Sequence, residues 1–328
     1  MIFPFFQVRH TAQTAQFSGF ILLTVMLLLP TLLPGEMGWL TSLVPLPIFY
    51  YLVVLGKRKG MILMRNALLL SAGAALLFGS LPILIFAFTM VPLGIAFSQA
   101  IYHRQTPVKA GLVGAVFLAL TWCIFWSGLG MLQQTNPYTS LLSELDAGLS
   151  GSLALYEKSA DLAPETLQML RNTVEALRIY IPKIFPALLV SSILSITWLN
   201  LVLGNWLLRK RNRELSPWPE YTAWKLPEFL VWLVISGGIA VIFLPSPLRI
   251  IGLNVLIICF TLYSFQGLAI LASLLNRWSV PRLFRVLIYA LIFIQTYGII
   301  IVSLLGLADV WADFRKLNTP DENTDAAS

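Results

Sequence analysis

Long apolar runs separated by short polar stretches dominate the sequence. Each run is roughly 18 to 25 residues long, which is the length that an α-helix needs to cross a hydrocarbon core of about 30 Å. The runs cover residues 18–35, 39–56, 61–80, 82–103, 109–132, 184–207, 227–244, 250–275 and 285–308. Continuous apolar runs, rather than alternating apolar and polar positions, favour helices over barrel strands. The pattern therefore predicts an all-α membrane protein with about nine transmembrane helices.

The composition agrees with this prediction. The chain has 328 residues, of which 58% are hydrophobic and 11% are charged. Soluble domains carry about 25% charged residues, and a water-soluble fold of this size could not hide so much apolar surface. A polytopic protein embedded in a lipid bilayer is the class that the composition indicates.

The distribution of basic residues predicts the orientation. With the N-terminus inside, the inner segments hold fifteen of the 22 Lys and Arg residues but three of the 15 Asp and Glu residues. This is the bias expected of loops on the cytoplasmic side. It predicts a protein of the bacterial cytoplasmic (inner) membrane with a cytoplasmic N-terminus and an extracytoplasmic C-terminus. Because short inner loops account for the excess positive charge, no nucleic-acid partner is expected.

The longest gap between the apolar runs, residues 133–183, falls on the outer side. It contains two apolar stripes with helical spacing: Leu142, Leu145, Leu149 and Leu153, and then Leu167, Leu170, Val174, Leu177 and Ile181. We predict an extracytoplasmic amphipathic helical hairpin between spans five and six. Its stripes either face each other or the bilayer surface, or they dock a partner or cover a ligand.

This hairpin divides the chain into parts. We expect a five-span part at 1–132, the hairpin at 133–183, a four-span part at 184–317 and a disordered tail at 318–328. The tail is polar and has no apolar anchor.

Charged residues are absent from the middle of the apolar runs. Arg65, Glu228 and Asp309 fall near run ends, where we expect them to reach water. Cys123 and Cys259 have no CxxC neighbour and no nearby histidine, so neither a metal site nor a redox site is indicated. No set of nucleophile, base or paired carboxylates is visible. The chain is therefore not expected to be an enzyme or to need a cofactor.

Uncharged polar residues do lie within the runs. Asn200, Gln266 and Gln295 are each roughly 15 Å from the predicted inner surface, at 1.5 Å per helical residue. Thr121 and Ser236 fall at similar depth. Two interpretations stay open: hydrogen bonds between helices, or one shallow polar pocket for a neutral or weakly polar solute.

The end of the last run reads "LLGLADVWADFRKL" (304–317). Asp309 and Asp313 are four residues apart and share a helix face, and Arg315 follows past the end of the span. Cations suit a helix C-terminus. The segment is interpreted as an interfacial stop with local charge pairing, or as a surface that docks a partner.

Four segments occur in a fixed order: an outer amphipathic helix that runs into "YIPKIFPALLV" (180–190), then "WLNLVLGNWLL" (198–208), "YSFQGLAILASLLNRWSVPR" (263–282) and the terminal segment quoted above. Together they resemble the YybS-like family, bacterial membrane proteins known as a domain of unknown function. The resemblance implies a helical core similar to S subunits of energy-coupling-factor transporters. Those subunits bind a solute from outside and work with a T-type membrane subunit and two ATPases.

Two functions are therefore expected as alternatives. The first is a solute-binding or transport-associated membrane subunit. The second is a non-transporting scaffold or assembly factor that recruits envelope or division proteins.

Overall fold

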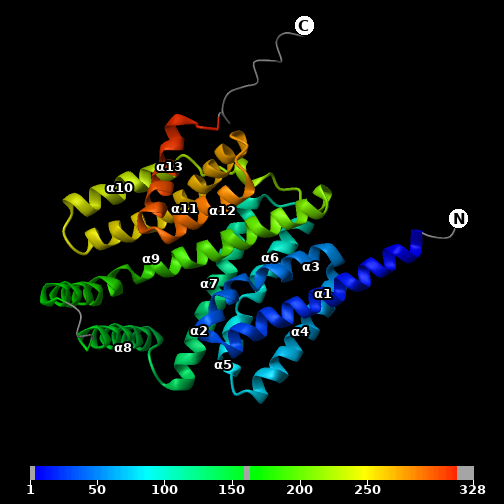
Figure 1. Cartoon of the computed structure of the whole chain (residues 1–328), viewed down its shortest axis with the longest axis horizontal. Helices are drawn as coiled ribbons and strands as arrows, with labels where there is room; N and C mark the ends of the chain where they lie inside the picture. The colour runs from blue at the N-terminus through cyan, green and yellow to red at the C-terminus, as the bar shows by residue number, and fades with distance from the viewer. Residues whose placement is uncertain (1–3, 159–162, 316–328) are drawn as a thin grey trace, which may run out of the picture. The chain divides into compact units, whose positions relative to one another are not determined.

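The computed structural model of the chain describes residues 4–158 and 163–315. Within these two ranges the chain forms thirteen α-helices and three short 3₁₀-helices, and neither range contains a strand (Figure 1). The predicted all-α class is confirmed. The predicted disordered tail, 318–328, lies outside the described residues.

The chain divides into two compact units. The first comprises Met1–Pro182 and Ser195–Trp218, and the second comprises Lys183–Leu194 and Pro219–Ser328. The 48-residue helix α9 (Pro164–Arg211) contributes to both.

The first unit holds the helices before α9 and the first 3₁₀-helices. Six of the seven helices from α2 to α8 have proline at their first or second position, where its missing N–H has no helical partner to lose. The elements are α1 (Pro4–Leu32), α2 (Pro34–Met37), η1 (Gly38–Leu43), α3 (Pro45–Leu55), α4 (Lys57–Leu77), α5 (Leu81–Phe88), α6 (Val91–Tyr102), α7 (Pro107–Gln133), α8 (Pro137–Glu157) and η2 (Arg213–Leu215).

Trp218 is buried in the core of the first unit. Its side chain is 2% exposed, and its ring lies 5.9 Å from that of Phe49. The indole Nε1–H donates to the carbonyl of Gln105 over 2.8 Å, and the Trp218 carbonyl accepts from Nη1 of Arg209 over 2.8 Å. The segment that follows α9 is thereby fixed to the loop between α6 and α7.

The second unit contains η3 (Tyr221–Ala223), α10 (Leu230–Phe243), α11 (Leu248–Arg277), α12 (Arg282–Ile294) and α13 (Thr296–Ala312). Asn254 of α11 joins these helices to Lys183–Leu194, the part of α9 that belongs to the second unit. Its Nδ2 donates to the carbonyl of Lys183 and its Oδ1 accepts from the N–H of Ala187, both over 2.9 Å. The hydroxyl of Thr261 donates to that of Ser191 over 3.0 Å. This part of α9 and α11 therefore run parallel.

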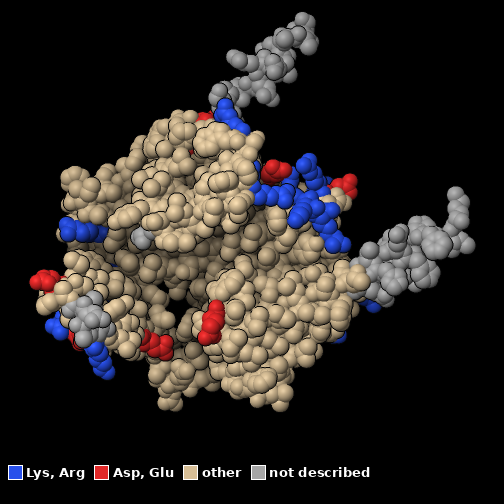
Figure 2. All heavy atoms as spheres, in the orientation of Figure 1, with Lys and Arg blue, Asp and Glu red and all other residues tan. Residues whose placement is uncertain are grey.

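Seven helical segments of the described ranges, two of them made of consecutive shorter helices, are long and apolar enough to cross a membrane: Thr14–Leu32, Pro34–Leu55, Lys57–Leu77, Leu81–Tyr102, Pro107–Gln133, Pro164–Arg211 and Leu248–Arg277. Most of the visible surface carries no Lys, Arg, Asp or Glu (Figure 2), as expected of helices that face lipid.

Two predicted spans differ from the seven. The run at 227–244 forms α10, which has only 14 residues. The run at 285–308 is divided between α12 and α13, which are bent by 105° relative to each other. Counting that pair as one span gives eight, so the predicted number of nine is not confirmed.

Candidate functional site: a buried polar cluster against helix α11

The chain before α10 lies along α11 without forming a regular helix. Pro219 and Pro227 interrupt this stretch, and proline prevents a continuous helix because it lacks an N–H. The hydroxyl of Tyr221 donates to the carbonyl of Phe265, and the N–H of Leu226 donates to Oε1 of Gln266 over 2.9 Å. Backbone groups outside a helix need such partners when they are buried.

Gln266 connects this segment to the end of α13. Its side chain is fully buried, and its Nε2 donates to Oδ2 of Asp309 over 3.1 Å. Since its Oε1 is bound to Leu226, both ends of the amide are satisfied within the protein. One side chain of α11 thus bridges two segments that are distant in sequence.

Asp309 and Arg315 form a buried ion pair. Nη2 of Arg315 lies 2.8 Å from Oδ2 of Asp309, and the two side chains are 2% and 1% exposed, respectively. The other carboxylate oxygen of Asp309 accepts from the N–H of Phe314 over 3.0 Å. Asp313 has a φ of 37°, in the left-handed region that Asp tolerates better than most residues, and this turn directs the chain back toward Asp309.

Arg315 also binds the segment between α9 and α10. Its Nη1 donates to the carbonyls of Thr222 and Trp224 over 2.9 Å and 2.7 Å. We refer to Gln266, Asp309, Arg315 and the backbone of residues 222–226 as the polar cluster. The Nε–H of Arg315 and the hydroxyl of Tyr263 are buried and have no hydrogen-bond partner.

Two glycines bring α13 close enough to α11 for these contacts. A Cβ on Gly267 would overlap the carbonyl oxygen of Val302, and a Cβ on Gly306 would overlap the carbonyl oxygen of Tyr263. Small residues allow such a close approach of two membrane helices. Because Asp309 is three residues beyond Gly306, it faces Gln266, which precedes Gly267.

The polar cluster lies against the middle of α11. Gln266 is 11 residues before Arg277, or about 16 Å along the helix. Asp309, which was expected to reach water at a span end, is instead buried at 2% exposure. The difference arises because α13 packs antiparallel to α11 and ends beside its centre.

The other polar residues predicted to bind solute do not join this cluster. In the first unit, Nδ2 of Asn200 donates to the carbonyls of Ser42 and Ile196 over 2.7 Å and 2.8 Å, and the hydroxyl of Thr121 donates to the carbonyl of Thr89 over 3.0 Å.

In the second unit, Ser236 is exposed on α10, where its hydroxyl donates to the carbonyl of Leu233 over 3.2 Å. Gln295 is exposed at the break between α12 and α13. Of the five predicted solute-binding residues, the structure brings Gln266 into a hydrogen bond with Asp309, the ion-pair partner of Arg315. The sequence assigned Asp309 and Arg315 to a different kind of site.

The apolar stripe predicted to dock a partner lies in the first turns of α9, beside α8 (Figure 1). Ion pairs link the two helices: Arg171 lies 2.8 Å from Glu157, and Arg178 lies 2.6 Å from Asp146. Most of the stripe is half-buried, namely Leu167, Leu170, Val174 and Ile181, whereas Leu177 is exposed. The stripe on α8 is half-buried as well. This burial is consistent with stripes that face the other helix of the hairpin.

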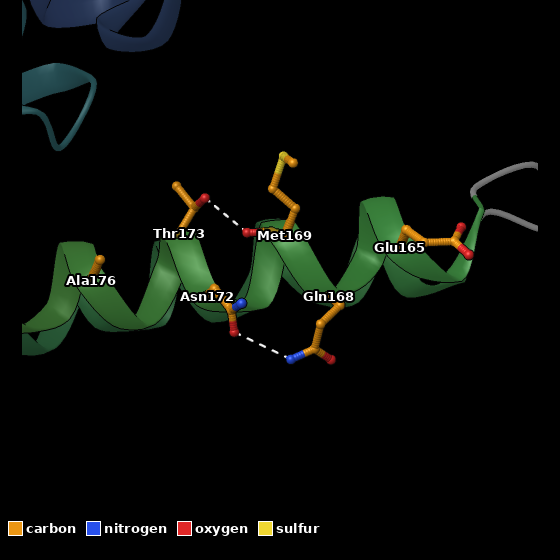
Figure 3. Close-up of a pocket in the computed structure, with 6 residues that line it drawn as sticks. All are labelled: Glu165, Gln168, Met169, Asn172, Thr173 and Ala176. Atoms are coloured by element: carbon orange, nitrogen blue, oxygen red, sulfur yellow. Dashed lines mark hydrogen bonds between the residues drawn. The ribbon is translucent and has the colours of Figure 1, made fainter.

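The opposite side of α9 carries a shallow groove lined by Glu165, Gln168, Met169, Asn172, Thr173 and Ala176 (Figure 3). Its polar side chains bond within the helix: Nε2 of Gln168 donates to Oδ1 of Asn172 over 3.2 Å, and the hydroxyl of Thr173 donates to the carbonyl of Met169 over 2.8 Å. Met169 and Gln168 point away from each other. The groove therefore lacks convergent polar groups.

The sequence did not reveal that the segment at 221–226 forms no α-helix, nor the role of Asn254. The closely spaced prolines at 217, 219 and 227 are the signal that could have indicated an interrupted helix. Within residues 4–158 and 163–315, no group of three or more His, Cys, Asp or Glu side chains is placed to hold a metal ion. The expected absence of a cofactor stays a prediction.

The fold and the buried cluster define a polytopic helical membrane protein. The sequence model of the family described as "Predicted membrane protein (DUF2232)" matches residues 21–310, and the chain belongs to this family. The match is consistent with the resemblance to the YybS-like family. Comparison with curated proteins finds no match, and comparison with solved structures finds none either. The similarity to energy-coupling-factor S subunits stays a prediction.

Proposed function

We propose that this protein is a solute-binding membrane subunit associated with transport, and that the polar cluster is its binding region. The observation that carries the proposal is a buried ion pair, Asp309–Arg315, bound to Gln266 at the middle of a membrane-spanning helix. Charged side chains inside a membrane are costly, and they usually mark the path or site of a solute or ion.

The shortness of α10 and the irregular segment before it support the same proposal. Many transporters bind their solute where a membrane helix is discontinuous and its unwound backbone is held by side chains. The 14 residues of α10 cover about 21 Å, and the preceding segment at 221–226, beside Gln266, contains one short 3₁₀-helix and no α-helix. Because the two charges of the cluster neutralise each other, a small neutral or weakly polar solute suits it better than an ion.

Two tyrosine variants, Tyr263→Phe and Tyr102→Phe, test this proposal. The hydroxyl of Tyr263 is buried without a partner, so Tyr263→Phe removes no hydrogen bond from the folded protein. The hydroxyl of Tyr102 donates to the carbonyl of Leu52 over 2.6 Å, so Tyr102→Phe removes one in the first unit. Native mass spectrometry of each purified variant identifies small molecules that remain bound.

We expect the wild type to retain a bound small molecule. Tyr263→Phe should retain at least tenfold less of this molecule, without loss of thermal stability. Tyr102→Phe should lower thermal stability slightly and keep the bound molecule. If Tyr263→Phe retained as much as the wild type, the cluster would be only a structural support for residues 221–226.

The association with transport has its own test. Isolation from native-host membranes in mild detergent should recover a T-type membrane subunit together with ATPases. We further propose the cytoplasmic N-terminus and the extracytoplasmic C-terminus that the basic residues favour. Fusions of the full chain to alkaline phosphatase or to a fluorescent protein, at either end, test that orientation.

A scaffold or assembly factor is the second candidate, and the α8–α9 hairpin favours it. No residue of α8 is buried, and side chains such as Tyr156 and Met169 are 51% and 70% exposed. Deleting residues 137–180 should then abolish recovery of an envelope or division protein. Unchanged recovery after the deletion would contradict this role.

A further inference from the structure

Helix α12 exposes apolar side chains along most of its length. The residues Leu283, Phe284, Val286, Leu287, Leu291, Phe293 and Ile294 have exposed fractions between 55% and 80%. Its half-buried side is marked by Arg285, Ile288, Tyr289 and Ile292, which recur at helical spacing. Two of the three polar residues of this helix, Arg285 and Tyr289, therefore face the protein together with isoleucines, whereas the outward side is apolar. This is the reverse of a helix that faces water.

Both ends of α12 lie near the same end of α11. At its start, Nε of Arg285 donates to the carbonyl of Val280 over 2.7 Å, and its Nη1 donates to Oδ1 of Asn276, close to the C-terminus of α11. At its end, the chain turns through 105° into α13.

The direction of α13 locates that second end. Gly306 packs against Tyr263 and Val302 against Gly267. Going backward along α13 therefore leads toward the Arg277 end of α11. A helix of 13 residues, about 20 Å long, whose two ends are at one level has to run roughly perpendicular to the axes of α11 and α13.

The surroundings of α12 favour lipid as the partner that covers its apolar side. Its apolar side adjoins α13, where Ile299, Ile300, Ile301 and Leu304 are also exposed on a membrane helix. Arg277 and Arg282 flank the start of α12 and are exposed, as suits side chains at the level of lipid headgroups.

We propose that α12 lies along the membrane surface at the Arg277 end of α11, with its outward side in the acyl chains of that leaflet. The predicted last span is then not one continuous helix: α12 anchors the second unit to one leaflet, and α13 alone enters the bundle. This inference is independent of the solute-binding proposal.

Depth-dependent fluorescence quenching tests it. Cysteine replaces, one at a time, Leu283, Leu287, Leu291 or Ile294 in the full chain carrying Cys123→Ser and Cys259→Ser. Each is labelled with an environment-sensitive fluorophore and reconstituted into vesicles of phosphatidylcholine and phosphatidylglycerol. Quencher lipids carry a nitroxide either near the headgroup or near the end of the acyl chain. All four labels should report the same shallow depth.

Helix α7 supplies the matched control in the same protein. Leu112, Val116, Leu120 and Ile124 are exposed along one side of a candidate span, with exposed fractions between 53% and 72%. Labels there should report depths that change by about 18 Å in total. Because all eight positions are exposed, their substitution should leave the elution profile of the purified protein unchanged.

Three outcomes would overturn the proposal. A graded depth from position 283 to position 294 would mean that α12 crosses the membrane. Quenching by aqueous iodide would mean that the apolar side is in water. Protection from both lipid and aqueous quenchers would mean that a protein, such as a second copy of this chain, covers it.

Discussion

Gln266 and Asp309 are 43 residues apart in sequence, yet Nε2 of Gln266 donates to Oδ2 of Asp309 over 3.1 Å. This hydrogen bond joins the middle of α11 to the last turn of α13. The Oε1 of the same glutamine accepts from the N–H of Leu226. Gln266 therefore connects this backbone group to the buried Asp309–Arg315 pair. A glutamine and an aspartate that the sequence assigned to different sites therefore belong to one cluster.

Replacing Arg315 by leucine should strongly destabilise the protein. The substitution leaves the Asp309 carboxylate buried without its cation and leaves the carbonyls of Thr222 and Trp224 without their donor. Breaking one side of a buried pair costs about 3–5 kcal/mol. The measurement is thermal unfolding followed by the reactivity of Cys259, which is buried, in a Cys123→Ser background. Arg282→Leu is the control, since Arg282 is exposed and its loss should change stability by about 0.5 kcal/mol or less.

Removing both charges should be less harmful than removing Arg315 alone. In Asp309→Leu combined with Arg315→Leu, no uncompensated charge remains in the apolar interior. The carbonyls of Thr222 and Trp224 still lack a donor, and Nε2 of Gln266 and the N–H of Phe314 lack an acceptor. We expect part of the lost melting temperature to return. A double variant less stable than Arg315→Leu would mean that the ion pair contributes little beyond its packing.

Alanine at Gly267 or Gly306 should separate α11 from α13. The added methyl group would overlap a carbonyl oxygen of the facing backbone, which cannot rotate away as a side chain can. Overpacking of this kind costs about 1–3 kcal/mol. Gly238 on α10 is the matched control, because a Cβ there meets no atom within 4 Å. Gly238→Ala should therefore be neutral or stabilise by up to about 1 kcal/mol, and equal melting temperatures for all three variants would contradict the close crossing.

Trp218 should be the most sensitive tryptophan of the first unit. Trp218→Phe loses the hydrogen bond to Gln105, worth about 1 kcal/mol, and Trp218→Ala also loses a buried ring, for a total of about 3–5 kcal/mol. Thermal unfolding of the purified variants measures both effects. Trp232, which is 69% exposed, supplies the control, and Trp232→Phe should leave the unfolding temperature unchanged.

The ion pairs of the α8–α9 hairpin should contribute little to global stability. The side chains of Arg178 and Asp146 are 36% and 55% exposed, so water and salt screen their attraction. Arg178→Ala should reduce stability by about 1 kcal/mol or less, and the reduction should shrink as the salt concentration rises. Limited proteolysis at low and high salt measures the effect on the hairpin itself, with Lys183→Ala as a charge-matched control. An effect of Arg178→Ala that did not depend on salt would argue for packing instead of charge.

Apolar length and loop charge allowed the sequence to predict class and most spans. Seven predicted runs correspond to helices long enough to cross a membrane, because a run of about 20 apolar residues has few other stable solutions. The runs at 227–244 and 285–308 do not form continuous helices of the predicted length, for local reasons. Pro227 and the residues before it leave only 14 helical residues in α10, and the extended backbone of Gln295 (ψ of 120°) interrupts the last run.

Depth along a single helix was also predictable to a degree. Gln266 was expected near the middle of its span, and it lies about 16 Å from Arg277 along α11. Its partners were not predictable in this way. Sequence spacing measures distance only along one helix, whereas Asp309 reaches Gln266 because two glycines let α13 approach α11 from the side.

The sequence by itself determined that this protein is helical and membrane-embedded, because a continuous apolar backbone in lipid has to satisfy its own hydrogen bonds within each helix. Only the tertiary structure decided where its charges lie. Whether an aspartate at the end of an apolar run meets water or a buried arginine depends on how deep its helix ends beside a neighbour, and that depth is set by the close crossing at Gly267 and Gly306.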